Sequence, residues 1–200
     1  MNKEGEIDRQ LVQRVQRGEN IAFDLLVSKY QRRLFRLVLR LVGDAAEAED
    51  IVQETFIKAY RALPHFRGDS AFYTWLYRIG INTARHFLET RGRRIPALKD
   101  LGTEHAETSG DKASQSDGET PESALLARQI AETINQAMDE LPQDLRIALA
   151  LREFDGLSYG EIAQAMACPL GTVRSRIFRA REAIAEKLQP LLEPGIDKRR

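Results

Sequence analysis

The stretch LSYGEIAQAMACPLGTVRSRIFRAREAIAEKL, residues 157–188, carries the most specific local pattern in the chain. Ser158, followed three residues later by Glu161, is a capping-box pattern and predicts that a helix starts there. Residues 168–171 include a proline and a glycine that interrupt this helix, and Thr172 can cap a new one. Two short helices joined by a tight turn form a helix-turn-helix.

The second helix of this pair divides into an apolar side and a basic side when each residue is turned by about 100°. The apolar side, which we expect to be buried, consists of Val173, Ile177, Ala180, Ile184 and Leu188. The opposite side consists of Ser175, Phe178 and Arg179, flanked by Arg174 and Arg176. Arginine binds guanine edges, serine contacts bases or phosphates, and phenylalanine touches the thymine methyl group. The turn, the cap and the exposed phenylalanine favour a DNA-reading helix over the alternative, a solvated basic face.

The segment FRGDSAFYTWLYRIGINTARHFLETRGRR, residues 66–94, is rich in aromatic and basic residues. On the helix predicted here, Trp75, Arg78, Asn82 and Arg85 share one stripe. Aromatic rings stack on unpaired bases and arginines follow phosphates, so the stripe suits single-stranded DNA. The alternative is that the aromatic rings pack against neighbouring helices, and the residues alone leave both interpretations open.

A third helix is predicted over Ala45–Leu63, and Asp44 can cap its first turn, just as Asn20 can cap the preceding helix. Its residues Glu49, Asp50, Gln53 and Phe56 lie near one another. An acidic and polar group with an aromatic ring suits docking onto a basic partner protein. Acidic residues also favour the start of any helix through its dipole, so this alternative remains open as well.

The formal net charge of zero conceals an uneven distribution along the chain. Residues 1–95 carry 17 basic and 12 acidic side chains, whereas residues 96–122 carry 2 and 7. The second segment is also poor in apolar residues, so it cannot bury enough surface to offset its ordering entropy. We therefore expect two all-α domains joined by a flexible acidic linker, with no period-2 pattern that would predict strands.

Several function classes are excluded by what the sequence lacks. A single cysteine, Cys168, excludes a disulfide scaffold and a multi-cysteine zinc site. His65, His86 and His105 lack the spacing of metal ligands. Neither a phosphate-binding loop nor a nucleophile–base set is recognisable, so we expect no metal, no cofactor, no small-molecule substrate and no enzymatic activity. The absence of a signal peptide or membrane span predicts a cytoplasmic protein.

Three long segments together carry a resemblance: AEDIVQETFIKAYRAL (48–63), FRGDSAFYTWLYRI (66–79) and GTVRSRIFRAREAI (171–184). The chain resembles the extracytoplasmic-function sigma factors of bacterial RNA polymerase, and among them the sigma-E/AlgU envelope-stress type. The resemblance implies a sigma-2 domain over residues 1–95, a linker over 96–122 and a sigma-4 domain over 123–193. A basic tail, 194–200, extends beyond the usual end.

The resemblance also implies roles for individual residues. The residues that the resemblance implies for docking on the clamp coiled coil of core RNA polymerase are Glu49, Asp50, Gln53, Glu54 and Phe56. The residues implied for recognition and melting of the −10 element are Lys58, Phe66, Trp75, Tyr77 and Asn82. The helical stripe described above adds Arg78 and Arg85 to this set. Recognition of the −35 element falls to Arg174, Ser175, Arg176, Phe178 and Arg179.

The implied partners are core RNA polymerase, through its clamp coiled coil and flap, promoter DNA, and a membrane-anchored anti-sigma factor. The implied function is promoter-specific transcription initiation in an extracytoplasmic stress response. A stand-alone helix-turn-helix regulator, with residues 1–95 as a dimerisation or ligand domain, is the alternative, but it does not explain the Trp75–Asn82 stripe. Gly80 departs from the family pattern, in which alanine is common at this position.

Overall fold

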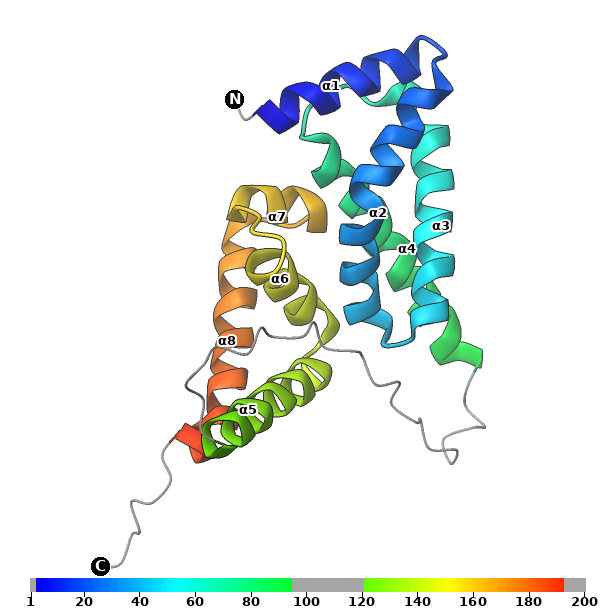
Figure 1. Ribbon diagram of the computed structural model, residues 1–200. Helices are drawn as coiled ribbons and strands as arrows, with labels where there is room; N and C mark the ends of the chain where they lie inside the picture. The colour runs from blue at the N-terminus through cyan, green and yellow to red at the C-terminus, as the bar shows by residue number, and fades with distance from the viewer. Residues whose placement is uncertain (1–2, 95–120, 193–200) are drawn as a thin grey trace, which may run out of the picture.

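The computed structural model describes residues 3–94 and 121–192, and all of its regular elements are helical (Figure 1). The N-terminal block contains α1 (Lys3–Gln16), α2 (Asn20–Val42), α3 (Ala45–Ala62), a 3-10 turn (Leu63–His65) and α4 (Phe72–Arg94). The C-terminal block contains α5 (Pro121–Glu140), α6 (Gln143–Glu153), α7 (Tyr159–Met166) and α8 (Leu170–Leu192). The described residues include no strand, which confirms the all-α fold class.

The turn between α2 and α3 follows the local sequence closely. Gly43 takes a positive φ of 78° after α2, a conformation that glycine adopts without a steric penalty. Asp44 then accepts a hydrogen bond from the backbone N–H of Glu47 at 2.8 Å and caps α3, as predicted. This turn sets α2 and α3 side by side and antiparallel (Figure 1).

Helix α4 crosses behind α2 and α3 and completes the core of the N-terminal block. Gly80 explains how closely it approaches, because a Cβ at this position would lie 2.7 Å from Cδ1 of the fully buried Leu34 on α2. The glycine that departs from the family pattern therefore lies at a very tight helix contact of this block. A close contact of this kind fixes where the outer side of α4 lies relative to α2.

Two predicted helix caps are wrong. Helix α2 begins at Asn20 itself, and the amide oxygen of Asn20 accepts a hydrogen bond from Tyr60 on α3 at 2.8 Å. Helix α8 begins at Leu170, so Thr172 lies within its first turn. In both cases the helix starts earlier than the side-chain pattern indicates, because a backbone turn ahead of it already supplies the first helical hydrogen bonds.

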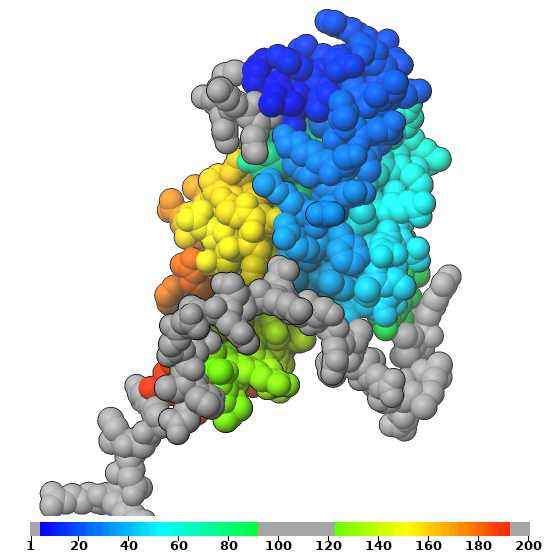
Figure 2. Space-filling view, in the orientation of Figure 1, coloured from blue at the N-terminus to red at the C-terminus, as the bar shows by residue number. Residues whose placement is uncertain are grey.

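The C-terminal block contacts the N-terminal block directly. Helix α7 packs against α4, and α6 packs against α2. Figure 2 shows the yellow residues of the C-terminal block in direct contact with the blue residues of the N-terminal block. The sequence predicts the two blocks but gives no sign of this contact. The predicted linker up to residue 120 and the tail 194–200 lie outside the described residues.

Candidate nucleic-acid and polymerase interfaces

The helix-turn-helix forms as the capping pattern predicts. The Ser158 backbone N–H donates to the Glu161 carboxylate at 2.8 Å, and the Ser158 hydroxyl accepts from the Glu161 N–H at 3.3 Å. Helix α7 ends with Ala167 in the left-handed region, at a φ of 51°. The chain then turns sharply into α8, so α8 is held at a fixed angle against α7 and α6.

One side of α8 faces solvent and is rich in basic groups. Val173, Ile177 and Ala180 are buried on the opposite side, as predicted. The solvent side, which we call the recognition face, consists of Arg174, Ser175, Phe178 and Arg179, all of them exposed. The Phe178 side chain is 66% exposed although it is large and apolar. Among the described residues neither Arg174 nor Arg179 has an ion-pair partner, so both cations are available to an anionic ligand.

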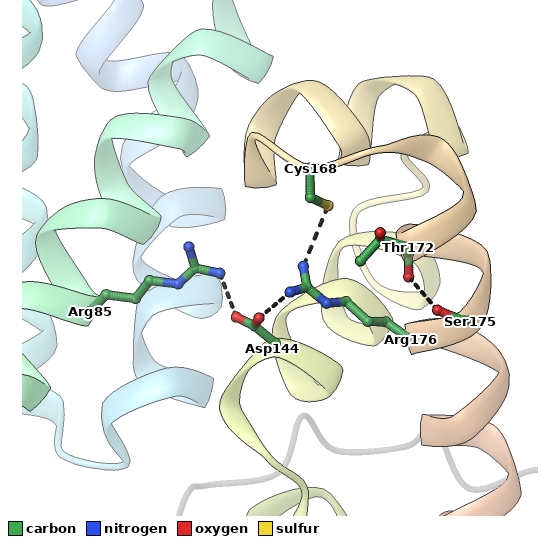
Figure 3. A network of polar contacts seen from close by, with 6 residues as sticks. All are labelled: Arg85, Asp144, Cys168, Thr172, Ser175 and Arg176. Carbon is green, nitrogen blue, oxygen red and sulfur yellow. Dashed lines mark hydrogen bonds and ion pairs between the residues drawn. The ribbon is translucent and has the colours of Figure 1, made fainter.

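Arg176 differs from its neighbours on α8, because its side chain is only 21% exposed. Its guanidinium forms an ion pair with Asp144 on α6 and lies 3.4 Å from the Cys168 sulfur in the turn (Figure 3). Ser175 donates to the carbonyl of Thr172 at 3.0 Å and remains exposed. Four of the five residues predicted to contact the −35 element thus lie on one open face, and Arg176 lies at its edge.

Helix α4 carries the second predicted DNA surface. Arg78 and Asn82 are exposed on it, one turn apart. Trp75 is half-buried, and its ring centroid lies 4.8 Å from that of Phe66 in the segment before α4. Lys58 reaches this surface from α3 and lies 3.2 Å from the Thr83 hydroxyl. We call the part of α4 that carries Trp75, Tyr77, Arg78, Asn82 and Arg85 the α4 face, although Tyr77 points toward the C-terminal block and away from Trp75.

The C-terminal block covers part of the α4 face. Tyr77 is 2% exposed, and its hydroxyl donates to Asp155 at 3.1 Å. Arg85 donates to Asp144 at 2.6 Å (Figure 3). In this conformation Trp75, Arg78 and Asn82 are open to a ligand, while Tyr77 and Arg85 are engaged with residues of α6 and the loop after it.

Burial raises the pKa of both Tyr77 and Asp155, which are in contact where the two blocks meet. Burial raises the pKa of the Tyr77 phenol, and the nearby Asp155 charge adds to the effect. Burial likewise raises the pKa of Asp155, although the Tyr77 hydrogen bond and the guanidinium of Arg40 oppose it. The Arg40 guanidinium also lies 3.8 Å from the ring centroid of Phe154, the residue before Asp155. The cause of both shifts is the burial of these groups where the two blocks meet.

A cleft of about 450 Å³ opens beside Trp75. Phe66 and Arg78 line it from the N-terminal block, and Gln164 and Ala167 line it from α7. Its aromatic and cationic walls suit an unpaired base with its phosphate. Part of the wall therefore belongs to the helix-turn-helix, and the cleft would widen if α7 moved away.

A larger groove of about 1090 Å³ lies between α2 and α3. Of the five predicted docking residues, Glu49, Gln53 and Phe56 line it, whereas Asp50 and Glu54 are exposed but do not. We call it the docking groove. Its α2 wall was missed by the sequence prediction and consists of Phe23, Val27, Gln31, Arg32, Phe35 and Arg36. The repeated apolar–arginine pairing in this stretch is the signal that could have indicated it.

Two further kinds of feature are absent from the described residues. Within residues 3–94 and 121–192, no group of three or more His, Cys, Asp or Glu side chains is placed to hold a metal ion. No helix in this part of the chain combines the length and the apolar character needed to cross a bilayer. The surfaces described above are two cationic faces and one apolar groove.

Comparison with known families matches both blocks. The sequence model for Sigma-70 region 2 matches residues 26–94, and the model for Sigma-70 region 4 matches residues 131–184. The first range includes α4 and every residue of the docking groove except Phe23, and the second includes α7 and most of α8. The alternative of a stand-alone regulator is therefore wrong, because its N-terminal region would be a dimerisation or ligand domain rather than Sigma-70 region 2.

Curated relatives are similar over nearly the whole chain. RNA polymerase sigma-H factor of Pseudomonas aeruginosa is 62% identical over 188 residues, which cover 94% of this chain and 96% of the relative. ECF RNA polymerase sigma-E factor of Escherichia coli K12 is 52% identical over 185 residues, which cover 92% and 96%. Identity at this level over this length shows common family membership.

Two solved structures share the fold at lower identity. Sigma factor RpoE of Bartonella quintana, solved with the anti-sigma factor NepR, superposes with a TM-score of 0.67 at 24% identity and covers 88% of this chain and 98% of its own. CnrH, solved with the cytosolic domain of CnrY, gives 0.65 at 24% identity and covers 92% and 97%. With both regions matched and relatives that span it almost completely, the chain belongs to the extracytoplasmic-function sigma factors of the sigma-70 family, which direct bacterial RNA polymerase to its promoters.

Proposed function

We propose that three surfaces of this sigma factor divide the work of promoter recognition among them. The recognition face of α8, with Arg176 at its edge, reads the −35 duplex. The α4 face, together with Lys58 and Phe66, holds the unpaired −10 strand. The docking groove, with Glu49, Gln53 and Phe56 in its wall, receives the clamp coiled coil of core polymerase. The domains concerned are the predicted sigma-2 domain, residues 1–95, and sigma-4 domain, residues 123–193.

One observation carries the proposal for α8. Phe178 is a large apolar side chain exposed between two arginines, Arg174 and Arg179, that have no ion-pair partner among the described residues. Its position between two arginines lets Phe178 add an apolar contact to a ligand that the arginines bind. A thymine methyl group and the flanking phosphates match this combination of groups.

The α4 face is supported by its chemistry. Arg78 and Asn82 are exposed beside the cleft that Phe66 and Trp75 line. An amide can read the edge of an unpaired base, and stacking on a ring is worth about 1–3 kcal/mol per base. These gains offset the few kcal/mol that unstacking a base costs. Strand separation at the −10 element then follows from binding, with no catalytic group.

Run-off transcription with purified core polymerase on a promoter library tests the proposal. Asn82→Ala is expected to reduce open-complex formation more than polymerase binding. His86→Ala, an equally exposed substitution one turn further along α4, is the control and is expected to change neither. Equal loss of both properties in the Asn82 variant contradicts the strand-binding role of this residue.

The docking groove is tested separately by competition for core polymerase. Gln53→Ala is expected to weaken polymerase binding, because Gln53 lines the groove. Glu54→Gln is expected to change it less, because Glu54 lies outside the groove and pairs with Lys58 at 2.8 Å. The reverse order of effects would place the polymerase on the outer side of α3 instead.

We further propose an anti-sigma factor, anchored in the membrane, as the regulator of this chain, with an extracytoplasmic stress as its signal. Two proteins of the same fold support the proposal, since RpoE was solved with an anti-sigma factor and CnrH with the cytosolic domain of CnrY. The site of action is the cytoplasm, where RNA polymerase works. Co-purification of the chain with membranes of unstressed cells, and its release on envelope damage, is the expected result.

A further inference from the structure

Residues 66–71, which connect the 3-10 turn to α4, form a wall between two hollows of the surface. On one side lies the cleft beside Trp75, and on the other lies a second hollow of about 650 Å³ that α1 borders. The residues of this segment that line both hollows are Phe66, Arg67, Asp69 and Ser70. Because both of its sides border open space, packing holds this segment weakly and its position depends on hydrogen bonds.

Gln16 on α1 supplies the side-chain hydrogen bonds that hold the start of this segment. Its amide nitrogen Nε2 donates to the carbonyl of Leu63 at 3.0 Å and to the carbonyl of Phe66 at 2.9 Å. A side-chain amide has two N–H donors, and these two contacts use both of them. The following residues, 67–69, form no hydrogen bond or ion pair with any other described residue. Gln16 is therefore the main polar support of the segment.

Helix α1 is a firm support for Gln16, because a buried carboxylate fastens this helix to α2. Asp8 is 3% exposed and accepts hydrogen bonds from the Tyr30 hydroxyl and, at 2.6 Å, from the Lys29 ammonium group. Val12, one turn further along α1, is buried in the same core. Gln16 follows one turn after Val12, so its position relative to the N-terminal block is fixed.

The ring of Phe66 is the part of the segment that this support controls. Its centroid lies 4.8 Å from that of Trp75 and 6.3 Å from that of the buried Phe72. The rotamers open to a side chain depend on its backbone angles, so a fixed Phe66 carbonyl also restricts where the ring can turn. The two rings that line the cleft are thus held together before any base arrives, which reduces the ordering cost of binding.

We propose that Gln16 is a positioning residue for −10 recognition, which fixes Phe66 against Trp75 so that the cleft is pre-formed for an unpaired base. Gln16 acts through Phe66 and touches no base itself. The inference rests on the proposed function, because it assigns this cleft to the unpaired strand. Gln16 lies outside residues 26–94, which the Sigma-70 region 2 model matches. Both of its partners belong to the N-terminal block, so its action does not depend on where the C-terminal block lies.

Gln16→Glu and Gln13→Glu form a matched pair of variants. Gln16→Glu keeps the length of the side chain, but an ionised carboxylate has no donor for the two carbonyl groups. Gln13→Glu adds the same charge to the same helix and borders the same second hollow. The Gln13 side chain has no hydrogen-bond partner among the described residues, so a difference between the variants reports the loss of the two hydrogen bonds.

Trp75 is the only tryptophan of the chain, so its fluorescence reports on the cleft directly. In the full-length chain without polymerase, Gln16→Glu is expected to increase the quenching of Trp75 by acrylamide, because Phe66 shields the indole less well. Gln16→Ala, which adds no charge, is expected to act in the same direction, and Gln13→Glu is expected to match the wild type. Melting curves by circular dichroism establish that the variants fold. Unchanged quenching in both Gln16 variants overturns the proposal, as does an equal increase in Gln13→Glu.

Holoenzyme assembled from core polymerase and each variant then tests the effect on the promoter. Gln16→Glu is expected to reduce open-complex formation about fivefold or more, the scale of two ordinary hydrogen bonds. Across a promoter library it is expected to weaken base preference at the −10 element and to leave −35 preference and polymerase binding unchanged. Equal losses in −10 preference, −35 preference and polymerase binding indicate a general structural defect and overturn the positioning role.

Phe66→Ala shows whether Gln16 acts through this ring. In a chain that already carries Phe66→Ala, Gln16→Glu is expected to cause no further loss of open complexes, and additive losses contradict action through Phe66. A loss for Phe66→Ala with wild-type behaviour of Gln16→Glu overturns only the inference about Gln16. Failure of the proposed function gives a different pattern, in which both variants change Trp75 quenching and neither changes open-complex formation.

Discussion

The recognition face of α8 and the α4 face have similar chemistry but different surroundings. Both combine arginines with an aromatic ring on one side of a long helix. On α8, Phe178 and its neighbouring arginines face solvent without partners among the described residues. On α4, Tyr77 is buried and Arg85 is paired, because the C-terminal block lies over them. Helical periodicity indicates which side chains point outward, but not whether another domain covers them.

This difference has an energetic meaning. Under the proposed function, residues of the recognition face reach DNA without first leaving a protein partner, so we expect their substitution to change DNA binding and not stability. Under the same proposal, the covered residues of the α4 face exchange protein partners for DNA. Their substitution therefore changes the stability of the contact between the blocks as well as the affinity for DNA.

The largest expected effect comes from removing both arginines of the recognition face. Arg174→Ala with Arg179→Ala is expected to cost about 2–6 kcal/mol in binding to −35 duplex DNA, at about 1–3 kcal/mol for each arginine removed. Thermal stability is expected to stay the same. Arg181→Ala, which removes a charge from α8 but faces Glu153, is the control. Comparable weakening of DNA binding in the control would show that only net charge matters.

The next prediction compares one aromatic residue on each face, Tyr77 on α4 and Phe178 on α8, by its effect on stability. Tyr77→Phe removes the donor to Asp155, whose second carboxylate oxygen already lacks a partner. We expect a loss of about 1–2 kcal/mol in the free energy of unfolding, the cost of a buried group left unsatisfied. Phe178→Ala is expected to leave the unfolding free energy unchanged and to weaken duplex binding. Chemical denaturation of both variants measures the contrast, and similar losses of stability would contradict it.

Gly80→Ala tests whether α4 is positioned by α2 beneath it rather than by the C-terminal block above. The new methyl group would lie 2.7 Å from Cδ1 of Leu34, so that side chain must move within a packed core. Overpacking costs about 1–3 kcal/mol, and the gain in helix propensity returns about 1 kcal/mol. We expect a net destabilisation of about 1 kcal/mol, relieved by Leu34→Val in the same chain. A more stable Gly80→Ala variant would show that the contact relaxes freely.

The smallest effect concerns pH. Burial raises the pKa of Asp155, so its charged form is disfavoured while the two blocks are in contact. As pH falls through this raised pKa, protonation removes the penalty and the contact between the blocks gains stability. Partial burial also raises the pKa of Glu161, but hydrogen bonds from Tyr73 and Ser158 outweigh it and leave the pKa below its usual value. Ionised Glu161 therefore stabilises the protein above the ordinary pKa of glutamate, and this contribution is lost as pH falls through the lowered pKa.

We therefore expect the radius of gyration, measured by small-angle scattering, to change in two phases as the pH is lowered from neutrality. The chain first becomes more compact as Asp155 takes up a proton, and then expands as Glu161 does. Asp155→Asn is expected to abolish the first phase and to keep the second. A wild-type chain that expands steadily over the whole range would contradict the direction assigned to Asp155.

Much of the fold follows from local patterns. The capping box at Ser158, the glycine stop at Gly43 and the cap at Asp44 all form as the sequence indicates. The apolar side of α8 is buried at Val173, Ile177 and Ala180. These features depend on residues within one or two helical turns of each other, so short-range chemistry decides them.

The sequence by itself determined the helices, the two blocks and which residues of α8 and α4 point outward, because periodicity and capping are local. Only the tertiary structure decided that Arg176 turns toward Asp144, that α2 supplies one wall of the docking groove, and that the C-terminal block contacts Tyr73 through α7 and Tyr77 through the loop after α6. Each of these depends on contacts between residues far apart along the chain. Such contacts arise from how whole surfaces fit together, and no short stretch of sequence contains that information.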